Sequence, residues 1–337
     1  MKAFALNAPR DLVFKDYSTP EIDPGEILIR VSHTGVCGTD AKIYSGAIPV
    51  NYPLIMGHEV VGEIVEADAT TGWRRGDKVI IDPMVACGSC FHCRLSQSNL
   101  CTRGVLLGRD ANGGFAEFIS VPLKNVFRLP PSIDIRTAPL IQVATTCFHA
   151  QRFAPLFPGE SAAIIGLGVT GQLHVQLAKA RGAYPIIGIS RSAPKRKLAE
   201  ELGADTTFES AGGVVNEILG ATGGRGVDVV IECTGSLSSL AVGIKAARVG
   251  GRVLLFGITT AKEGVFPFYD LYFKELAVYN ARAAKAEDFP VVIDLVRRGV
   301  LQLKPLVTHV FPFSDLSSAI ELLDLPIEER LKVIVEH

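Results

Sequence analysis

Short stretches of alternating apolar and polar residues run through the first 145 positions, as in Ile27–Val31 and Gly62–Glu66. Sequences rich in Gly, Pro, Asp and Asn separate them at 23–25, 75–77 and 112–114. Alternation with a period of two indicates half-buried strands, and these separators indicate turns. The sequence therefore predicts a β-rich, partly open barrel in this region.

The pattern changes at about Ser161, where short apolar runs begin to alternate with helical stretches. The predicted strands are 162–165, 186–189, 227–232 and 252–256, and the predicted helices between them are 170–181, 195–202 and 240–247. This βαβ rhythm is typical of a doubly wound parallel sheet in an α/β fold. A last helix, 289–298, precedes short strands that we expect to return to the first domain.

Composition narrows the class of protein. A chain of 337 residues is long enough for about two domains. The net charge of −1 argues against a nucleic-acid partner, and no apolar run is long enough to span a membrane. The N-terminus lacks the shape of a signal peptide, so we expect a cytoplasmic protein. Seven cysteines in a reducing compartment favour metal binding over disulfides.

Four of the cysteines follow the spacing C-x2-C-x2-C-x7-C, namely Cys87, Cys90, Cys93 and Cys101. Four thiolates this close in sequence complete a tetrahedral zinc shell, which makes the site structural because no position stays open. The alternative is four unrelated surface thiols, which would be open to oxidation without a metal. His92 is left out because four sulfurs already complete the shell.

A second group of metal-competent side chains is flanked by glycines. Cys37 is followed by Thr39 and Asp40, and Gly57 introduces His58 and Glu59. A Cys, a His and one later polar residue would form the three-ligand set of a catalytic zinc, which keeps one position open for water or substrate.

Residues 166–171 read GLGVTG and follow an apolar strand at the start of a predicted helix. In this context G-x-G-x-x-G indicates a dinucleotide site, formed here by Gly166, Leu167, Gly168, Val169 and Gly171. The glycines permit a tight turn and let a pyrophosphate approach the helix N-terminus. The alternative is a tight turn without a ligand.

The end of the second predicted strand favours NADP over NAD. NAD sites need an acidic residue there to bind the ribose hydroxyls, whereas this chain has Ser190 followed by Arg191. Ser190 can hydrogen-bond a 2′-phosphate and Arg191 can pair with it, while Lys195 and Arg196 add positive charge. The alternative is a solvated basic helix start.

These motifs together resemble those of the zinc-dependent medium-chain dehydrogenase/reductase family, which includes alcohol, sorbitol, threonine and glucose dehydrogenases. The resemblance extends over 35–40, 53–62, the four-cysteine lobe, the 166–171 turn, 226–235, 250–257 and 303–312. It implies a GroES-like catalytic domain at 1–146 and 282–337, and a Rossmann coenzyme domain at 147–281. It also implies a homodimer or homotetramer.

Carried over residue by residue, the resemblance makes Cys37 and His58 ligands of the catalytic zinc. Glu59 becomes a nearby acid that exchanges onto the metal in some relatives, and Thr39 becomes the hydroxyl that takes the substrate's proton. The third ligand, which is Cys or Glu in most relatives, aligns with Gln142, as it does in some glucose dehydrogenases. The alternative is that Gln142 only hydrogen-bonds a zinc-bound water. Cys147 lies five residues on, and we interpret it as a packing residue.

We also expect two basic residues, Lys42 and Arg282, to lie near the reacting groups. Lys42 stands where simple alcohol dehydrogenases have a His that ends a proton relay, so either its pKa is lowered by burial or the relay ends in water. Arg282, at the crossover between the domains, is expected to reach the cofactor or substrate. The other histidines are assigned no role.

The sequence therefore predicts an enzyme with two zinc ions per chain and NADP(H). It would transfer a hydride to or from a secondary alcohol of a small polyol or sugar-like substrate. One alternative is an NADPH-dependent aldehyde or ketone reductase. Another is a family member that binds zinc and NADP without turnover.

Overall fold

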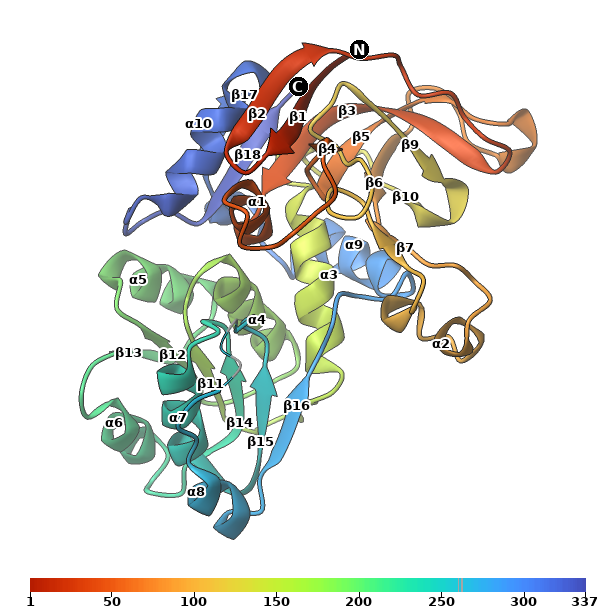
Figure 1. Cartoon of the computed structure of the whole chain (residues 1–337). Helices are drawn as coiled ribbons and strands as arrows, with labels where there is room; N and C mark the ends of the chain where they lie inside the picture. The colour runs from red at the N-terminus through yellow and green to blue at the C-terminus, as the bar shows by residue number, and fades with distance from the viewer. Residues whose placement is uncertain (260, 262) are drawn as a thin grey trace. The chain divides into compact units, whose positions relative to one another are not determined.

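The computed structural model describes residues 1–259, 261 and 263–337, and its contacts divide the chain into two compact units. Unit 1 comprises Met1–Thr145, Lys285–Arg298 and Leu303–His337, and unit 2 comprises Thr146–Ala284 and Gly299–Gln302. Figure 1 labels their elements. The domain boundaries inferred from the sequence stay a prediction.

Unit 1 is built around a seven-stranded sheet whose longest strand, β3 (Glu26–Val36), pairs with three others. Its partners are β5 (Glu59–Glu66), β9 (Phe118–Pro122) and β18 (Lys332–Glu336), and the outer strands are β6 (Lys78–Ile81), β10 (Val126–Arg128) and β17 (Val307–Pro312). A second sheet has β1 (Lys2–Ala8) between β2 (Asp11–Asp16) and β4 (Leu54–Ile55). The hairpin β7 (Met84–Val85) and β8 (Val105–Leu106) leads into the four-cysteine lobe.

The helices of unit 1 are short and lie between these strands. They are α1 (Gly38–Tyr44), α2 (Phe91–Arg94), α9 (Asp288–Arg297) and α10 (Leu316–Glu321), while α3 (Leu140–Gln151) crosses the boundary between the units. Alternate residues of β3, such as Ile27 and Ile29, are fully buried against Ile64 of β5. The C-terminal strand β18 pairs antiparallel with β3, so the end of the chain joins the first sheet.

Unit 2 is a six-stranded parallel sheet in the order β13-β12-β11-β14-β15-β16. Its strands are β11 (Ala162–Ile165), β12 (Ile186–Ser190), β13 (Thr206–Glu209), β14 (Val227–Glu232), β15 (Ala247–Leu255) and β16 (Ala277–Asn280). Its helices are α4 (Val169–Ala180), α5 (Ala193–Leu202), α6 (Val214–Ala221), α7 (Leu237–Ala246) and α8 (Phe268–Phe273).

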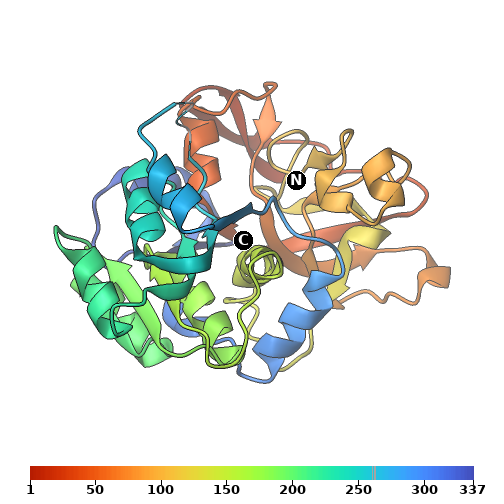
Figure 2. The same cartoon turned by 90° about the horizontal axis from the view of Figure 1, so that it is seen from below.

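Alternation within the strands of unit 2 creates two apolar faces. Ile164 packs with residues of α4 and α5, whereas Ile165 packs with residues of α6 and α7. Helices therefore cover both faces of the sheet, as Figures 1 and 2 show. The predicted fold class, a β-rich domain and a doubly wound parallel sheet, is confirmed. Strands β13 and β16 and helices α6 and α8 were not among the predicted elements of this unit.

Candidate active site and metal centres

Cys37, His58 and Glu59 come together in unit 1, at the end of β3 and the start of β5. The Cys37 sulfur, a His58 ring nitrogen and a Glu59 carboxylate oxygen lie within 4.8 Å of one another. His58 and Glu59 are 8% and 1% exposed. Cys37 is half-buried. Thiolate, imidazole and carboxylate are the groups that zinc prefers, so this cluster fits a zinc ion.

Asp40 is fully buried and links two members of this cluster. Its Oδ2 accepts a hydrogen bond from the backbone N–H of Cys37 at 2.8 Å, and its Oδ1 lies 3.3 Å from Nδ1 of His58. Burial lowers the pKa of His58, but the charge and hydrogen bond of Asp40, with a contribution from Cys37, raise it well above its usual value. A carboxylate on one ring nitrogen orients the ring and leaves the other nitrogen for a metal.

The sequence analysis named Asp40 only as part of a motif and did not assign it this role. The available signal was its position three residues after Cys37, where an acidic side chain can accept the backbone N–H at the start of a helix.

Glu59 meets a buried cation from the other end of the chain. Nζ of Lys332, at the start of β18, forms an ion pair with Oε2 of Glu59 and donates a hydrogen bond to the carbonyl of Val36 at 3.1 Å. Lys332 is 4% exposed. Nothing in the sequence analysis pointed to it.

The other predicted catalytic residues also lie in unit 1. Thr39 and Lys42 are half-buried in α1, and Gln142 is half-buried in the first turn of α3 between the buried residues Ile141 and Val143. Their functional roles stay predictions.

The four cysteines of the lobe converge at one point. The sulfurs of Cys87, Cys90, Cys93 and Cys101 all lie within 4.8 Å of one another. Cys90 Sγ is 3.5 Å from Cys93 Sγ and 3.7 Å from Cys101 Sγ. A tetrahedron with zinc–sulfur bonds of about 2.3 Å has sulfur–sulfur edges of about 3.8 Å, so these spacings fit one zinc ion.

Surrounding polar groups also favour thiolates in the lobe. Backbone N–H groups of Ser89 and Cys90 point at Cys87 and lower the pKa of its thiol to about 5. Partial burial and neighbouring thiols raise the pKa of Cys93 to about 12. Nη2 of Arg103 lies 3.5 Å from Cys87 Sγ and 2.7 Å from Ser89 Oγ. Because zinc binds cysteine as thiolate, a metal in this lobe would displace the proton that Cys93 otherwise keeps.

The glycine-rich turn of unit 2 lies between β11 and α4. Gly166 has φ +95°, and a Cβ on Gly171 would lie 2.0 Å from the Gly166 carbonyl oxygen, so close strand–helix packing requires both glycines. A Cβ on Gly168 would meet nothing within 4 Å, which leaves space at the helix N-terminus. Leu167 is buried and Val169 is the first residue of α4. This geometry fits a dinucleotide pyrophosphate.

The neighbouring strand ends place the predicted specificity residues. Chain order reverses between β11 and β14, and β12 ends next to this switch point at Ser190. Ser190 Oγ accepts a hydrogen bond from the Ser192 N–H at 3.2 Å, and Arg191 is exposed on the loop that follows. Arg196 Nη1 donates to the carbonyls of Ser190 and Arg191 at 2.7 and 3.0 Å. Arg196 therefore shapes this loop, and its contact with a cofactor stays a prediction.

Two more predicted cofactor contacts can be placed in unit 2. Lys195 is half-buried in the first turn of α5, and Arg282 is exposed just after β16. Their contacts with a cofactor also stay predictions.

Glu232 organises the strand ends on the other side of the switch point. Its buried carboxylate accepts hydrogen bonds from the N–H groups of Thr234 at 2.7 Å and Gly235 at 2.9 Å. Its backbone carbonyl accepts from Phe256 and Gly257 at 2.9 and 2.8 Å. This residue, which the sequence analysis did not single out, ties together the loops after β14 and β15.

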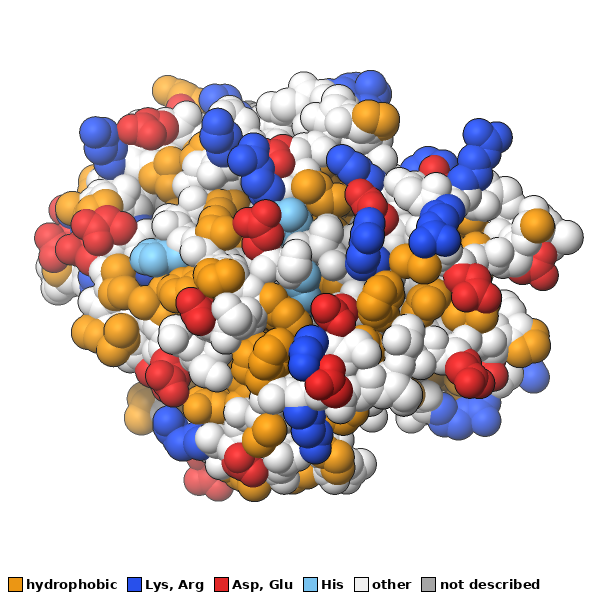
Figure 3. All heavy atoms as spheres, turned by 90° about the horizontal axis from the view of Figure 1, so that it is seen from above, with side chains coloured by type: hydrophobic (Ala, Val, Ile, Leu, Met, Phe, Trp, Pro, Cys, Tyr) orange, Lys and Arg blue, Asp and Glu red, His pale blue; other side chains and the backbone are white. Residues whose placement is uncertain are grey.

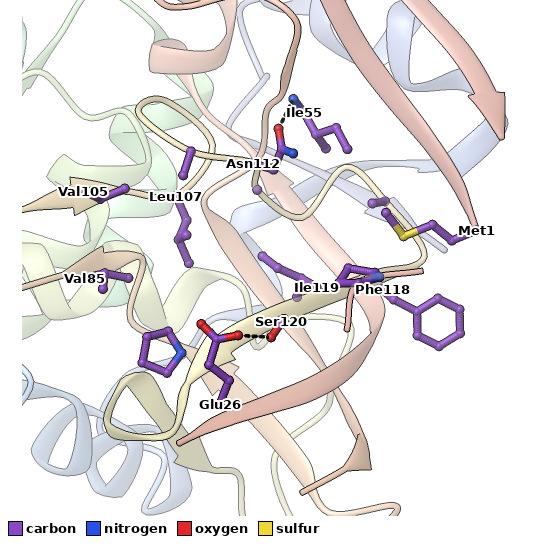
Figure 4. Close-up of a pocket in the computed structure, with 15 residues that line it drawn as sticks. Met1, Glu26, Ile55, Val85, Val105, Leu107, Asn112, Phe118, Ile119 and Ser120 are labelled. Atoms are coloured by element: carbon purple, nitrogen blue, oxygen red, sulfur yellow. Dashed lines mark hydrogen bonds between the residues drawn. The ribbon is translucent and has the colours of Figure 1, made fainter. Parts of the chain in front are cut away.

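Unit 1 also has a cavity of about 450 Å³ with a mostly apolar lining. Figure 4 shows its two polar contacts, between Glu26 and Ser120 at 2.6 Å and between Asn112 and the backbone of Ile55 at 3.0 Å. Among the residues that the structure describes, its lining includes none of the predicted zinc or cofactor residues, so we do not assign the substrate to it.

The charge distribution on the surface does not point to a particular class of binding partner. On the face drawn in Figure 3, acidic and basic side chains are intermixed. Within the described ranges, no helix has the length and apolar character needed to cross a bilayer.

Comparison with known proteins places these sites in a family context. Residues 23–131 match the alcohol dehydrogenase GroES-like domain, and residues 169–298 match the zinc-binding dehydrogenase domain. L-threonine 3-dehydrogenase of Pyrococcus abyssi is 36% identical over 91% of this chain and 90% of its own length. Sorbitol dehydrogenase of Halalkalibacterium halodurans is 32% identical over 89% of both chains.

Solved structures agree with these matches. A zinc-binding dehydrogenase structure from Sinorhizobium meliloti 1021, bound to NADP, superposes with a TM-score of 0.94 at 32% identity and covers 100% of this chain and 99% of its own. An Escherichia coli CFT073 alcohol dehydrogenase in complex with NADH superposes with a TM-score of 0.92 at 28% identity, with the same coverage. The two structures hold different cofactors.

Proposed function

This chain belongs to the zinc-binding alcohol dehydrogenase family, and from that premise we propose that it is a zinc- and NADP-dependent oxidoreductase acting on a secondary alcohol. The observation that carries the proposal is the Cys37–His58–Glu59 cluster, in a chain whose glycine-rich turn at Gly166 fits a dinucleotide. Relatives named for threonine and sorbitol support a small, polar, polyol- or sugar-like substrate.

The chain's own residues would hold the catalytic zinc and manage the proton. Cys37, His58 and Gln142 would bind the metal, with Asp40 fixing the His58 ring. Zinc would supply Lewis acidity toward the substrate oxygen. Thr39 would accept the hydroxyl proton and pass it outward. With one thiolate and two neutral ligands the site would carry a net charge of +1, which is more electrophilic than a site with two anionic ligands.

The cofactor would lie at the carboxyl ends of β11 and β12. The turn at Gly166, Gly168 and Gly171 would hold the pyrophosphate, while Ser190 and Arg191 would bind the 2′-phosphate. When bound by these residues, NADP would supply the hydride-transfer chemistry. The four-cysteine lobe would hold the second, structural zinc.

Cofactor choice is tested with Arg191→Ala, and Lys197→Ala, an exposed cation on α5, is the matched control. Hydrogen bonds to charged groups are worth about 1.5–3 kcal/mol. We therefore expect the KM for NADP to rise about 10–100-fold with little change for NAD, and the control to behave as wild type. Equal use of NAD and NADP by the wild-type protein would overturn the NADP assignment.

The activity is tested by following NADP reduction with a panel of polyols, aldoses, amino alcohols and simple alcohols. The reverse assay, NADPH oxidation with aldehydes and ketones, tests the reductase alternative. The residues proposed to bind the 2′-phosphate, Ser190 and Arg191, fit this alternative equally well, because it also uses NADPH. Bound zinc and NADP without turnover in either direction would instead identify a silent family member.

We also propose a homodimer or homotetramer. Strand β16 ends the sheet of unit 2, and the adjacent α8 presents Phe268, Tyr269, Tyr272 and Phe273, each more than 60% exposed. An aromatic patch of this kind is typical of a protein interface. Sedimentation of wild type and Tyr272→Glu tests it, and a wild-type monomer at micromolar concentration would contradict it.

A further inference from the structure

Lys332 lies beside the proposed catalytic zinc site without offering it a ligand. It is a buried cation at the start of β18, and it approaches the segment that contains Cys37 from the far end of the sequence. We propose that Lys332 is a positioning residue that holds Glu59 out of the zinc coordination shell and so keeps one metal position open. This inference rests on the proposed function of the Cys37–His58 site.

Two contacts fix the Lys332 ammonium group. It forms an ion pair with Oε2 of Glu59, and it donates a hydrogen bond to the carbonyl of Val36 at 3.1 Å. The side chains of Lys332 and Glu59 are 5% and 1% exposed, so water screens their attraction very little. Because Val36 directly precedes Cys37, the same ammonium group anchors the backbone next to a zinc ligand.

The backbone of β3 makes room for this pair. A Cβ on Gly35 would lie 1.9 Å from Oε2 of Glu59 and 2.8 Å from Cε of Lys332. Only glycine at this position lets the two side chains meet. The pairing is thus built into the fold, since β18 also aligns Ile334 with Gly35.

Glu59 is close enough to the metal ligands to be one itself. Its carboxylate oxygen lies within 4.8 Å of the Cys37 sulfur and a His58 nitrogen. A buried carboxylate needs a cationic partner, and this one has two candidates, the Lys332 ammonium group and a bound zinc ion. While Lys332 satisfies it, Glu59 has little to gain from entering the metal's shell.

An open metal position is what a catalytic zinc needs. Structural zinc sites are closed by four protein ligands, whereas catalytic sites keep a position for substrate. If Glu59 were free, it would complete the shell and compete with the substrate oxygen. Lys332 would therefore keep this site catalytic.

The test compares metal binding by Lys332→Met with binding by the double variant Glu59→Gln/Lys332→Met, which has neither buried charge. Zinc affinity comes from chelator competition. Cobalt substitution reports coordination, because its visible d–d bands shift when a carboxylate replaces the bound water in the fourth position. Cys37→Ala, which keeps the four-cysteine lobe, supplies the background signal.

We expect Lys332→Met to bind zinc at least tenfold more tightly than the double variant and to show shifted cobalt d–d bands. The double variant and Lys332→Arg should match the wild-type spectrum. Equal affinity and equal spectra in Lys332→Met and the double variant would overturn the inference.

If Lys332→Met does not fold, the cobalt spectra of Lys332→Arg and of the double variant test the inference instead. A wild-type spectrum in both supports the inference, and an altered spectrum in the folded double variant contradicts it. If wild type and Cys37→Ala give the same cobalt spectrum, Cys37 does not bind the metal and the proposed catalytic site itself is wrong. If their spectra differ but Lys332→Met and the double variant give equal spectra and affinities, the site is right and only the role of Lys332 is wrong.

Discussion

The two candidate metal centres of unit 1 are built in opposite ways. The four-cysteine lobe draws all its ligands from residues 87–101, and only Cys101 among them is buried. The Cys37–His58 centre draws its residues from the chain just after β3, the chain just before β5 and, by proposal, α3, and the buried carboxylates of Asp40 and Glu59 lie beside it.

This difference indicates different tasks. Four sulfurs that converge on one point would close the shell of a metal and tie a loop together, so their metal would contribute to stability. A centre with fewer ligands and oriented carboxylates leaves a position open and controls its charge. We therefore expect loss of zinc from the lobe to lower the stability of the fold, and loss of zinc from the Cys37 centre to abolish activity.

The largest effect should come from removing one sulfur at each centre. We expect Cys90→Ala to lose the lobe zinc and unfold at lower temperature, because metal binding at a structural site stabilises the fold. Cys37→Ala should lose the other zinc and all measurable activity while its thermal midpoint changes little. Thermal unfolding and activity of both variants check this, and equal loss of stability in both would remove the distinction.

Asp82, at the base of the lobe, should make stability depend on pH. Burial raises its pKa to about 7, the N–H of Met84 opposes this, and the charge of Asp288 adds to it. The folded state then keeps a proton that the unfolded state loses above its lower pKa, so stability falls as the pH rises from about 4 to 7.

We expect Asp82→Asn, which keeps the acceptor for Met84, to gain stability over wild type at pH 8 by up to about 4 kcal/mol, with a smaller gain at pH 5. Unfolding midpoints at both pH values measure this. Asp294→Asn, at a half-buried acid of α9 whose pKa is lowered by a hydrogen bond from Arg297, is the control and should show no such gain. A gain for Asp82→Asn that is the same at both pH values would contradict the prediction.

Asp40→Asn tests the Cys37 centre without touching a ligand. Losing a carboxylate that orients a ligating histidine typically weakens metal binding about 10–100-fold. We expect this loss at the Cys37 centre only, with zinc in the lobe retained. Chelator competition resolves the two ions, and unchanged affinity would show that Asp40 only caps α1.

Gln142 should give the smallest effect and sharpen the ligand assignment. Gln142→Glu should keep or tighten zinc, because a carboxylate is the better ligand, and should move the pH at which activity rises upward, because it neutralises the site. Gln142→Ala should weaken zinc. Indistinguishable zinc affinities in wild type and both variants would mean that Gln142 lies outside the metal's shell.

Features encoded by neighbouring residues could be predicted from the sequence. The lobe spacing and the turn at Gly166 each lie within a few residues, and the structure brings their members together. Strand β13 was missed because its residues are half-buried or exposed and give no apolar run.

Features that depend on distant contacts could not be predicted. The contact of Lys332 with Glu59 exists only because β18 pairs with β3. The hydrogen bonds of Arg196 to the Ser190 loop are another example, since its sequence position indicated only positive charge near the cofactor.

We propose that the two zinc ions have different tasks: one stabilises the fold and the other serves hydride transfer. The most direct test removes zinc stepwise with a chelator. Three quantities are recorded on the same samples: zinc per chain, the circular dichroism spectrum as a measure of the fold, and the rate of NADP reduction with an active alcohol. The account predicts that activity disappears as zinc falls from two to one per chain while the fold is retained, and that added zinc restores it. Full activity at one zinc per chain, or a wild-type protein that holds no more than one after zinc is added, would contradict it.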